Sequence, residues 1–281
     1  MSASEVGRVR VVRKGEGAPA GGTWARLGLT WAVTGDRLGA RHVCGGWFTP
    51  PPDNGAGWQG SLRVESAWYV TEGAIDVSWR QAAGPRQTRI SRGTFLYVPP
   101  ALEIGVRSAG RAAGLVLFGG ATSPDRVAGA ASFNRRAGEP AAANRPPWVA
   151  RVDELPSDTD YEPPLDMRWG VTERLGGARL LCGARTLNPP RGRIQHHYHE
   201  GVEAVIFFLG GSFRIFSGPD RKPADVGPGD VAYIAPGTLH SYCSMEADGM
   251  AEEVAFYGGI ASKEAATPVF VEEPWPSIRA R

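Results

Sequence analysis

The chain has 281 residues, 42% of them hydrophobic, and a formal net charge of +2. This length suits two domains of ordinary size or one large domain. No basic block or acidic tail is present, so charge gives no support for nucleic-acid binding and little for a membrane surface. The apolar run 204–209 is far too short to span a bilayer, and the first residues carry charges where a secretion signal would be apolar. We expect a soluble cytoplasmic protein that has neither nucleic acid nor membrane as a partner.

The cysteines point to the same compartment. Cys44, Cys182 and Cys243 are odd in number, widely spaced and form no CxxC motif. Cysteines in this arrangement are typical of reduced, buried thiols rather than of a disulfide framework. We therefore expect three free thiols, mostly buried.

An internal repeat organises the sequence. The stretch WYVTEG (68–73) resembles VIFFLG (205–210), and GTFLYVPPA (93–101) resembles GDVAYIAPG (229–237). The two halves are offset by about 137 positions. Each half has alternating apolar positions and glycine–proline turns, and no stretch keeps a helical apolar period over three turns. The pattern predicts an all-β protein made of two similar β-domains.

The repeat also suggests where the domains divide. We expect an N-terminal domain at 1–122 and a C-terminal domain at 167–281. The residues between them, 123–166, are rich in Ala, Pro, Arg and Asp, which favours a linker over the surface, with room for a short helix. A single large sandwich is the alternative, but it would not explain the repeat.

The motif HHYHEGVE (196–203) concentrates three of the five histidines. Because strand side chains alternate between faces, His197 and His199 would point one way and His196 the other, toward packing. Gly201 would bend the chain, so that Glu203 returns to the face of the two histidines.

A second turn completes the expected site. In an antiparallel barrel, the GTLH turn would bring His240 beside the first histidines. Three neutral imidazoles and the Glu203 carboxylate would then suit one divalent transition metal, with open positions for water, dioxygen or substrate. Iron(II) is favoured, and Mn, Ni, Zn and Cu remain alternatives. The remaining histidine, His42, stands alone and has no predicted role.

These residues resemble the two motifs of the cupin superfamily. His197-x-His199-(x)3-Glu203-(x)6-Gly210 follows the first motif, and the segment 229–240, which ends in His240, follows the second. The resemblance implies two tandem cupin barrels of jelly-roll type. Its departures, Arg191 at the opening glycine and Ala235 at the usual proline, remove no ligand.

The first half resembles a cupin only in its frame. At the positions that carry metal ligands in the family it has non-ligating residues, among them Ser66, Leu62 and Ile104. The resemblance therefore implies a degenerate first barrel without a metal and a second barrel that binds one. A cryptic ligand site in the first barrel remains the alternative to a packing role.

Parity along the strands suggests which side chains line the metal pocket. Two steps back from His197 lies Gln195, and a further two steps back lies Arg193. Phe207 shares the parity of Glu203, and Tyr242 shares that of His240. We expect these to be the substrate-binding residues: Arg193, Gln195, Phe207 and Tyr242. Salt bridging by Arg193 and core packing by the two aromatic residues are the alternatives.

The resemblance leaves several functions open. An enzyme with oxygenase-type chemistry on a phenolic or keto/hydroxy acid is favoured, because a cationic metal and an aromatic wall suit such small molecules. A hydrolase or isomerase resembling the bicupin ureidoglycine aminohydrolases is the second possibility, and a non-catalytic metabolite-binding cupin is the third. A homodimer is expected, as in many cupins, and the segments VRVVRK and VFVEEPWP are candidates to cover exposed strand edges within a chain or across the dimer.

Overall fold

The computed structural model describes residues 7–52, 57–81, 84–127 and 145–271. The first half contains β1 (Arg10–Val12), β2 (Ala18–Pro19), η2 (Gly22–Leu27), β3 (Leu29–Val33), α1 (Gly35–Leu38), β4 (Val43–Phe48), β5 (Trp58–Ser61), β6 (Glu65–Gln81), β7 (Gly84–Ser91), β8 (Thr94–Val98), β9 (Glu103–Gly119) and α2 (Pro124–Val127). The second half contains β10 (Trp148–Arg151), η4 (Val152–Glu154), β11 (Asp166–Val171), α3 (Glu173–Gly176), β12 (Leu181–Asn188), β13 (His197–Tyr198), β14 (Glu203–Gly210), β15 (Phe213–Ser217), β16 (Lys222–Val226), β17 (Val231–Ile234), β18 (His240–Ser244), β19 (Ala251–Gly258), η5 (Glu264–Ala266) and β20 (Val269–Phe270).

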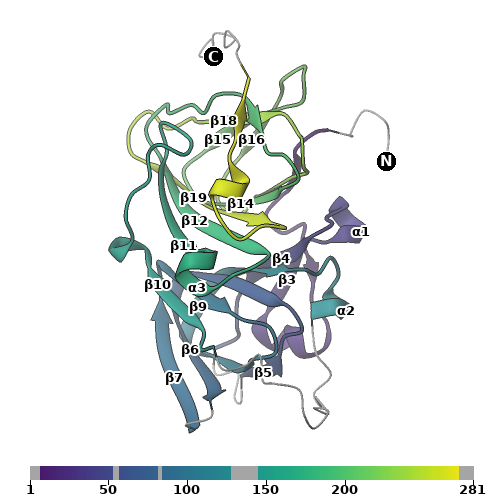
Figure 1. The fold of residues 1–281 in the computed structure, drawn as a ribbon, viewed down its shortest axis with the longest axis vertical. Coiled ribbons are helices and arrows are strands. Elements are labelled where there is room, and N and C mark those ends of the chain that lie inside the picture. Colours follow the sequence, from purple (N-terminus) through teal and green to yellow (C-terminus); the bar gives the residue numbers. More distant parts are fainter. Residues whose placement is uncertain (1–6, 53–56, 82–83, 128–144, 272–281) are drawn as a thin grey trace.

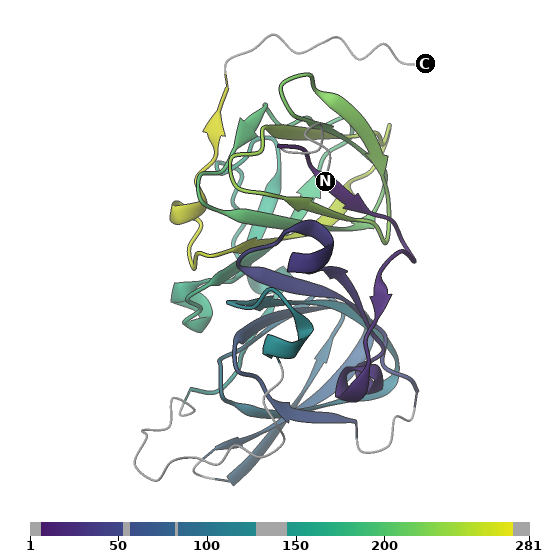
Figure 2. The same ribbon diagram turned by 90° about the vertical axis from the view of Figure 1, so that its right-hand side faces the viewer.

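Antiparallel sheets build two β-barrels, one above the other (Figures 1 and 2). The first barrel is a nine-stranded sheet with the path β10-β8-β6-β9-β4-β3-β2, to which β5 and β7 add. The second combines a six-stranded sheet, β1-β17-β14-β19-β12-β11, with a five-stranded sheet, β16-β15-β18-β13-β20. The all-β prediction is therefore confirmed, and among the described residues no helix is long and apolar enough to cross a membrane.

The long strands β6 and β9 curve the first sheet on itself. Their register shifts between Val70 and Glu72 and again between Gly73 and Ile75. Gly73 has φ of +64°, and a Cβ there would lie 1.9 Å from the carbonyl oxygen of Arg111. Only glycine fits this backbone approach, so the repeated glycine marks a bulge that bends the sheet.

One strand from each half of the chain pairs with the barrel formed by the other half. β1, near the N-terminus, pairs with β17 of the second barrel, with Arg10 opposite Tyr233. β10 pairs with β8 of the first barrel, with Trp148 opposite Tyr97. The segment VRVVRK thus covers an edge within the chain, and the two barrels are joined by strands that cross the expected division at 122/123. The segment VFVEEPWP lies partly outside the described residues; its first two residues form β20, which pairs with β13.

One-turn helices shape the loops between the barrels. The Thr34 hydroxyl accepts a hydrogen bond from the backbone N–H of Arg37 at 3.2 Å, and α1 ends at Gly39 with φ of +66°. The Thr172 hydroxyl caps α3 in the same way, and Gly177 ends it with φ of +73°. A threonine N-cap and a left-handed glycine define both ends of so short a helix. The following loop in each half is thereby directed at the opposite barrel.

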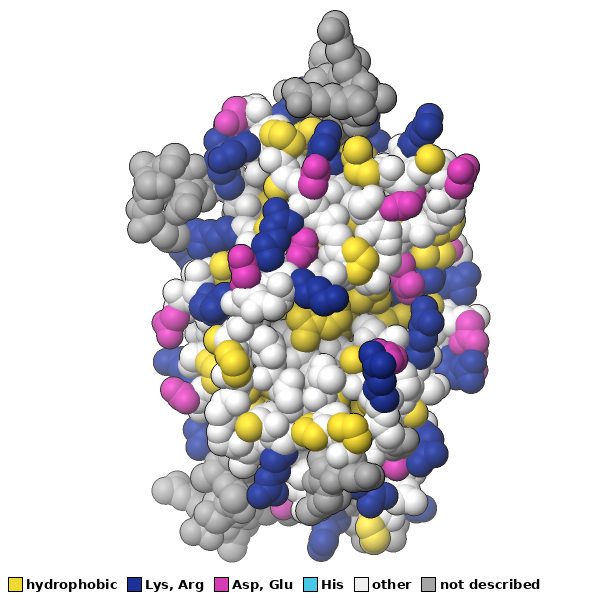
Figure 3. Space-filling view, turned by 180° about the vertical axis from the view of Figure 1, so that it is seen from behind, with side chains coloured by type: hydrophobic (Ala, Val, Ile, Leu, Met, Phe, Trp, Pro, Cys, Tyr) yellow, Lys and Arg dark blue, Asp and Glu magenta, His cyan; other side chains and the backbone are white. Residues whose placement is uncertain are grey.

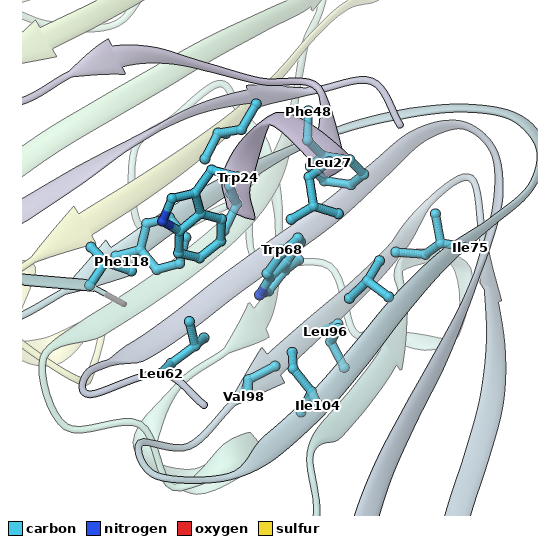
Figure 4. Close-up of a cluster of buried hydrophobic side chains, with 14 of the residues drawn as sticks. Trp24, Leu27, Phe48, Leu62, Trp68, Ile75, Leu96, Val98, Ile104 and Phe118 are labelled. Carbon is cyan, nitrogen blue, oxygen red and sulfur yellow. The ribbon is translucent and has the colours of Figure 1, made fainter. Parts of the chain in front are cut away.

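Apolar side chains fill three layers. The interior of the first barrel is closed by η2, whose Trp24 packs edge-on against Phe118 at 5.3 Å (Figure 4). Between the barrels, the Trp47 ring lies edge-on to Phe207 at 5.3 Å. A third layer fills part of the second barrel. All three cysteines are free and buried, as predicted.

Candidate metal centre

Three histidines converge inside the second barrel. His197 on β13 lies opposite His240 on β18 in the strand ladder, and His199 follows directly after β13. One ligand atom from each of the three lies within 4.8 Å of the corresponding atoms of the other two. The three side chains are buried, with exposed fractions of 0–3%. The two turns that the motifs predicted to meet therefore do meet.

Backbone carbonyls fix the orientation of each ring. The Nδ1 atoms of His197, His199 and His240 lie 2.8, 2.6 and 2.8 Å from the carbonyl oxygens of Gln195, Ala266 and Thr238. An imidazole that donates from Nδ1 presents the Nε2 lone pair to a metal. His197 Nε2 is buried and has no hydrogen-bond partner among the described residues. This donor set fits a divalent transition metal.

Burial keeps the three imidazoles in the form that binds metal. It lowers the pKa of His199 to about 4 and that of His240 to about 3, and it holds the pKa of His197 well below its ordinary value. Repulsion from neighbouring histidines further lowers the pKa of His197 and His240. At neutral pH all three rings are neutral and available as ligands.

The acidic group beside the histidines is Glu162. Its Oε1 atom lies 3.7 Å from His197 Nε2 and 3.6 Å from His199 Nε2, and it accepts a hydrogen bond from the Tyr257 hydroxyl at 3.4 Å. Burial raises the pKa of Glu162 to about 8. The residue lies in the stretch 123–166, which the sequence indicated as a surface linker, because no motif spacing connects it to histidines more than thirty positions away.

The expected role of Glu203 as fourth metal ligand is wrong, because its carboxylate lies between the two barrels and not beside the histidines. Its carboxylate accepts backbone N–H groups from Arg41 at 2.5 Å and His42 at 2.9 Å, and the Tyr233 hydroxyl at 2.8 Å. Even-numbered residues of β14 such as Ala204 face the interior of the second barrel. The odd-numbered residues, Glu203 among them, therefore face the first barrel.

Phe207 lies on the same face of β14 as Glu203, so it does not line the pocket around the histidines. It is fully buried in the layer between the barrels, against Trp47. Phe207 and Glu203 do share one face of β14, as predicted, but this face is turned to the first barrel and not to the histidines. A packing role, the alternative to substrate binding, is what the structure shows for Phe207.

Gln195 reaches His197 with its backbone carbonyl and not with its side chain. Gln195 is exposed, and its side-chain amide donates to the carbonyl of Val271 at 3.0 Å. Arg193 is half-buried and forms an isolated backbone bridge with Cys243, while its neighbour Ile194 enters the core. β13 covers only two residues, so the alternation counted back from His197 does not hold there.

Tyr242 does face the barrel interior. It is buried at 3% exposure and its hydroxyl donates to Glu253 on β19. Two further interior groups on β12, the Thr186 hydroxyl and the Asn188 amide, have no hydrogen-bond partner among the described residues, nor has Glu253 Oε2. The barrel thus presents a polar interior beyond the histidines, and substrate binding by Tyr242 stays a prediction.

His196 and His42 behave as expected. His196 is buried, and its backbone carbonyl accepts from Val271 at 2.8 Å. His42 is exposed and contributes a backbone N–H, not its ring, to Glu203. Neither imidazole belongs to the cluster of three.

Comparison with known proteins gives matches in structure only. No protein-family model matches the chain, and the search of curated protein sequences found no match. A tryptophan variant of Bacillus subtilis oxalate decarboxylase superposes with a TM-score of 0.68 and 12% identity, over 93% of this chain and 79% of that chain. The formate complex of Lactobacillus farciminis oxalate decarboxylase gives 0.67 and 12%, over 93% and 88%.

A third structure concerns the Mn(II) centres of the Bacillus subtilis oxalate decarboxylase. It matches with a TM-score of 0.63 and 13% identity, over 86% of this chain and 74% of that chain. At such identities the likeness shows the fold and leaves activity open. The chain is a protein with the two-barrel cupin fold of the oxalate decarboxylases.

Proposed function

We propose that the chain is a metal-dependent enzyme that acts on a small carboxylate in its second barrel. The observation that carries this proposal is the set of three buried Nε2 atoms, each oriented by a carbonyl on Nδ1, with a buried carboxyl group beside them. A structural zinc site would normally close four positions with protein ligands. Three imidazoles leave room for a substrate.

The charges of the second barrel favour an anionic substrate that chelates the metal. Among the described residues, the buried set contains no lysine or arginine, so the bound cation would supply the positive charge. A divalent ion held by His197, His199 and His240 would act as a Lewis acid on substrate oxygens. The apolar side chains around the polar groups of this interior would limit the access of water to the same space.

Glu162 suits the role of proton donor and acceptor. Its Oε1 atom lies beside two of the Nε2 atoms, and burial favours its protonated form. Cleavage of a carbon–carbon bond next to a carboxylate leaves a carbon that must gain a proton, and a carboxyl group held there can deliver it. This arrangement favours decarboxylation or a related proton-transfer reaction over the oxygenase chemistry of the sequence analysis, which stays an untested expectation.

The proposal is tested by loading the protein with Mn(II), Fe(II) or Zn(II) and supplying oxalate or a 2-hydroxy or 2-keto acid. Loss of substrate with release of carbon dioxide and no net oxygen uptake would support it. Nothing in the structure favours iron over manganese, so both ions are tested as the bound metal. Stoichiometric oxygen uptake would instead support the oxygenase alternative.

Glu162→Gln sharpens the test. Removing the titratable oxygen while keeping the side-chain volume should lower kcat by about 10²–10⁴-fold if Glu162 transfers the proton. The metal content, measured by elemental analysis, should stay close to that of the wild type. Glu200→Gln, a matched change at an exposed carboxylate next to His199, is the control and should leave kcat unchanged. A kcat of the Glu162→Gln variant equal to that of the wild type would show that Glu162 does not transfer the proton.

A homodimer also remains a proposal, and sedimentation of the purified protein would decide it.

A further inference from the structure

A cavity of about 490 Å³ lies between the two barrels, away from the histidines. Its walls come from both halves, with Thr30, Trp47 and Tyr69 on one side and Leu209 and Pro228 on the other. Figure 3 shows apolar side chains gathered at the level where the barrels meet, with basic and acidic side chains around them. The volume is within the range of sites that hold small organic ligands.

The acidic side chains of this cavity are already paired. Glu72 lies 2.8 Å from the Arg111 guanidinium. Glu252 lies 3.0 Å from the guanidinium of Arg185. Neither arginine lines the cavity. The negative charge at its wall is therefore largely compensated from outside.

The basic side chains of the cavity have no carboxylate partner in the part of the chain that the structure describes. Within the part of the chain that the structure describes, Lys14 and Arg92 line the cavity and have no carboxylate in ion-pair distance. The backbone N–H of Lys14 donates to Asp230 at 2.8 Å, and its aliphatic stem packs on Gly229, where an added Cβ would meet Cδ at 2.7 Å. The backbone and the stem of Lys14 are therefore held against the second barrel, and its exposed side chain keeps an ammonium group without a carboxylate partner among the described residues. The cavity carries an excess of available positive charge.

Two aromatic rings line this side of the cavity. Trp47 is half-buried, and its ring forms part of the wall. Its Nε1 atom is out of reach of a water-sized group, so Trp47 offers the cavity its ring and not its N–H group. The ring of Tyr69, buried on the same side, adds an apolar wall.

From these features we propose that the cavity is a second binding site, for a small aromatic carboxylate. Lys14 and Arg92 pair with the carboxylate, and the aromatic ring packs on Trp47 and Tyr69. The site is independent of the metal centre, because none of its three histidines lines this cavity.

Calorimetric titration with 3-phenylpropionate and with the neutral 3-phenylpropanamide tests the charge argument. The carboxylate should bind at least about tenfold more tightly than the amide, since charge-assisted hydrogen bonds are about twice as strong as neutral ones. Lys14→Met and Arg92→Gln should each weaken the carboxylate about tenfold and leave the amide unchanged. Lys222→Met, on exposed β16, removes the same charge and should have no effect. Equal binding of acid and amide would overturn the proposal.

Trp47→Leu tests the aromatic wall. It removes the ring on which the ligand packs, so both probes should bind more weakly. Unfolding curves measured alongside show whether the variant is folded. Unchanged affinity for both probes in a folded variant would exclude the indole from the site.

Metal removal separates this site from the active centre. Titration of chelator-treated protein, and of His240→Ala, should give the same affinity for 3-phenylpropionate as the untreated protein. Affinity that disappears with the metal and ignores Lys14→Met would place the carboxylate on the metal and overturn the second site. Failure of the proposed enzymatic function would leave the titration results at this cavity unchanged.

Discussion

The two barrels share one frame but not one interior. In the first barrel Glu65 accepts the backbone N–H groups of Arg179 at 3.0 Å and Leu180 at 2.6 Å, and the Tyr97 hydroxyl at 3.0 Å. Glu203 accepts the same kinds of bonds: two backbone N–H groups from the loop of the first barrel, Arg41 and His42, and one hydroxyl from its own barrel, Tyr233. These contacts are reciprocal, so each barrel holds the loop of the other through one buried carboxylate.

The interiors of the two barrels differ at the positions that histidines occupy in the second barrel. Ile104 and Leu62, which the sequence analysis placed at ligand positions, are buried in the apolar core of the first barrel (Figure 4). The second barrel has its buried histidines and Glu162 instead. The comparison teaches that the repeated glutamate belongs to the frame, since both barrels have it, while the chemistry depends on residues that only one barrel has.

The largest expected effect comes from His240→Ala. Without this imidazole two nitrogens remain, and metal affinity should fall by at least about tenfold. Elemental analysis after gel filtration measures it. His42→Ala, which removes an exposed imidazole outside the cluster, should keep the metal content of the wild type. If His240→Ala retained a full equivalent of metal, the histidines would not be the site.

Ile104→Ala makes the matching change in the first barrel. Because Ile104 is buried at 3% exposure, the change should cost about 3 kcal/mol in the free energy of unfolding. Metal content should not change, because the first barrel contributes none of the three histidines. Urea unfolding gives the first quantity, and Met250→Ala, at 51% exposure, is a control with little expected loss. A drop in metal content would contradict an apolar role for the first barrel.

The sequence predicted the frame and the three histidines well, because both rest on local patterns. The repeat of glycine turns and alternating strands indicated two barrels, and the spacing of His197, His199 and His240 predicted the cluster that forms the candidate metal centre. The pair of TGDRLG (34–39) and TERLGG (172–177), which forms α1 and α3, would have extended the repeat.

The errors have a physical cause. A motif gives the order of residues, but it does not say toward which side a strand turns after a glycine such as Gly201. Glu203 was therefore assigned to the metal although it faces the other barrel. Glu162 enters the site from a distant segment, and such a tertiary contact leaves no pattern in one sequence.

Glu203→Gln and Glu65→Gln test the reciprocal contacts as a pair. An amide cannot accept with both of its terminal atoms, so one of the buried N–H or O–H donors loses its acceptor. Each variant should lose about 2 kcal/mol of unfolding free energy, and the two losses should be similar. Both should keep their metal. Loss of metal from Glu203→Gln alone would restore that residue as a ligand and break the symmetry.

The smallest effect concerns the pH dependence of stability in metal-free protein. Burial raises the pKa of Glu253 to about 8, so between its ordinary value and 8 the folded state binds the proton more tightly than the unfolded chain does. Stability then falls as pH rises through this window, by up to about 1.4 kcal/mol per pH unit for one proton.

The interval from pH 6.5 to 8 isolates this acid effect. The depressed histidine pKa values act only below about 6.5, where they make stability rise with pH. The pKa of Glu162 is raised in the same way, so in the Glu253→Gln variant Glu162 still makes the free energy of unfolding fall with rising pH. Glu253→Gln should therefore reduce the downward slope by about half without abolishing it, measured by urea unfolding of chelator-treated protein. The first barrel offers the control, because Ile104→Ala changes the level of stability and leaves this slope intact. An identical slope in wild type and Glu253→Gln would show that Glu253 is ionised in the folded state.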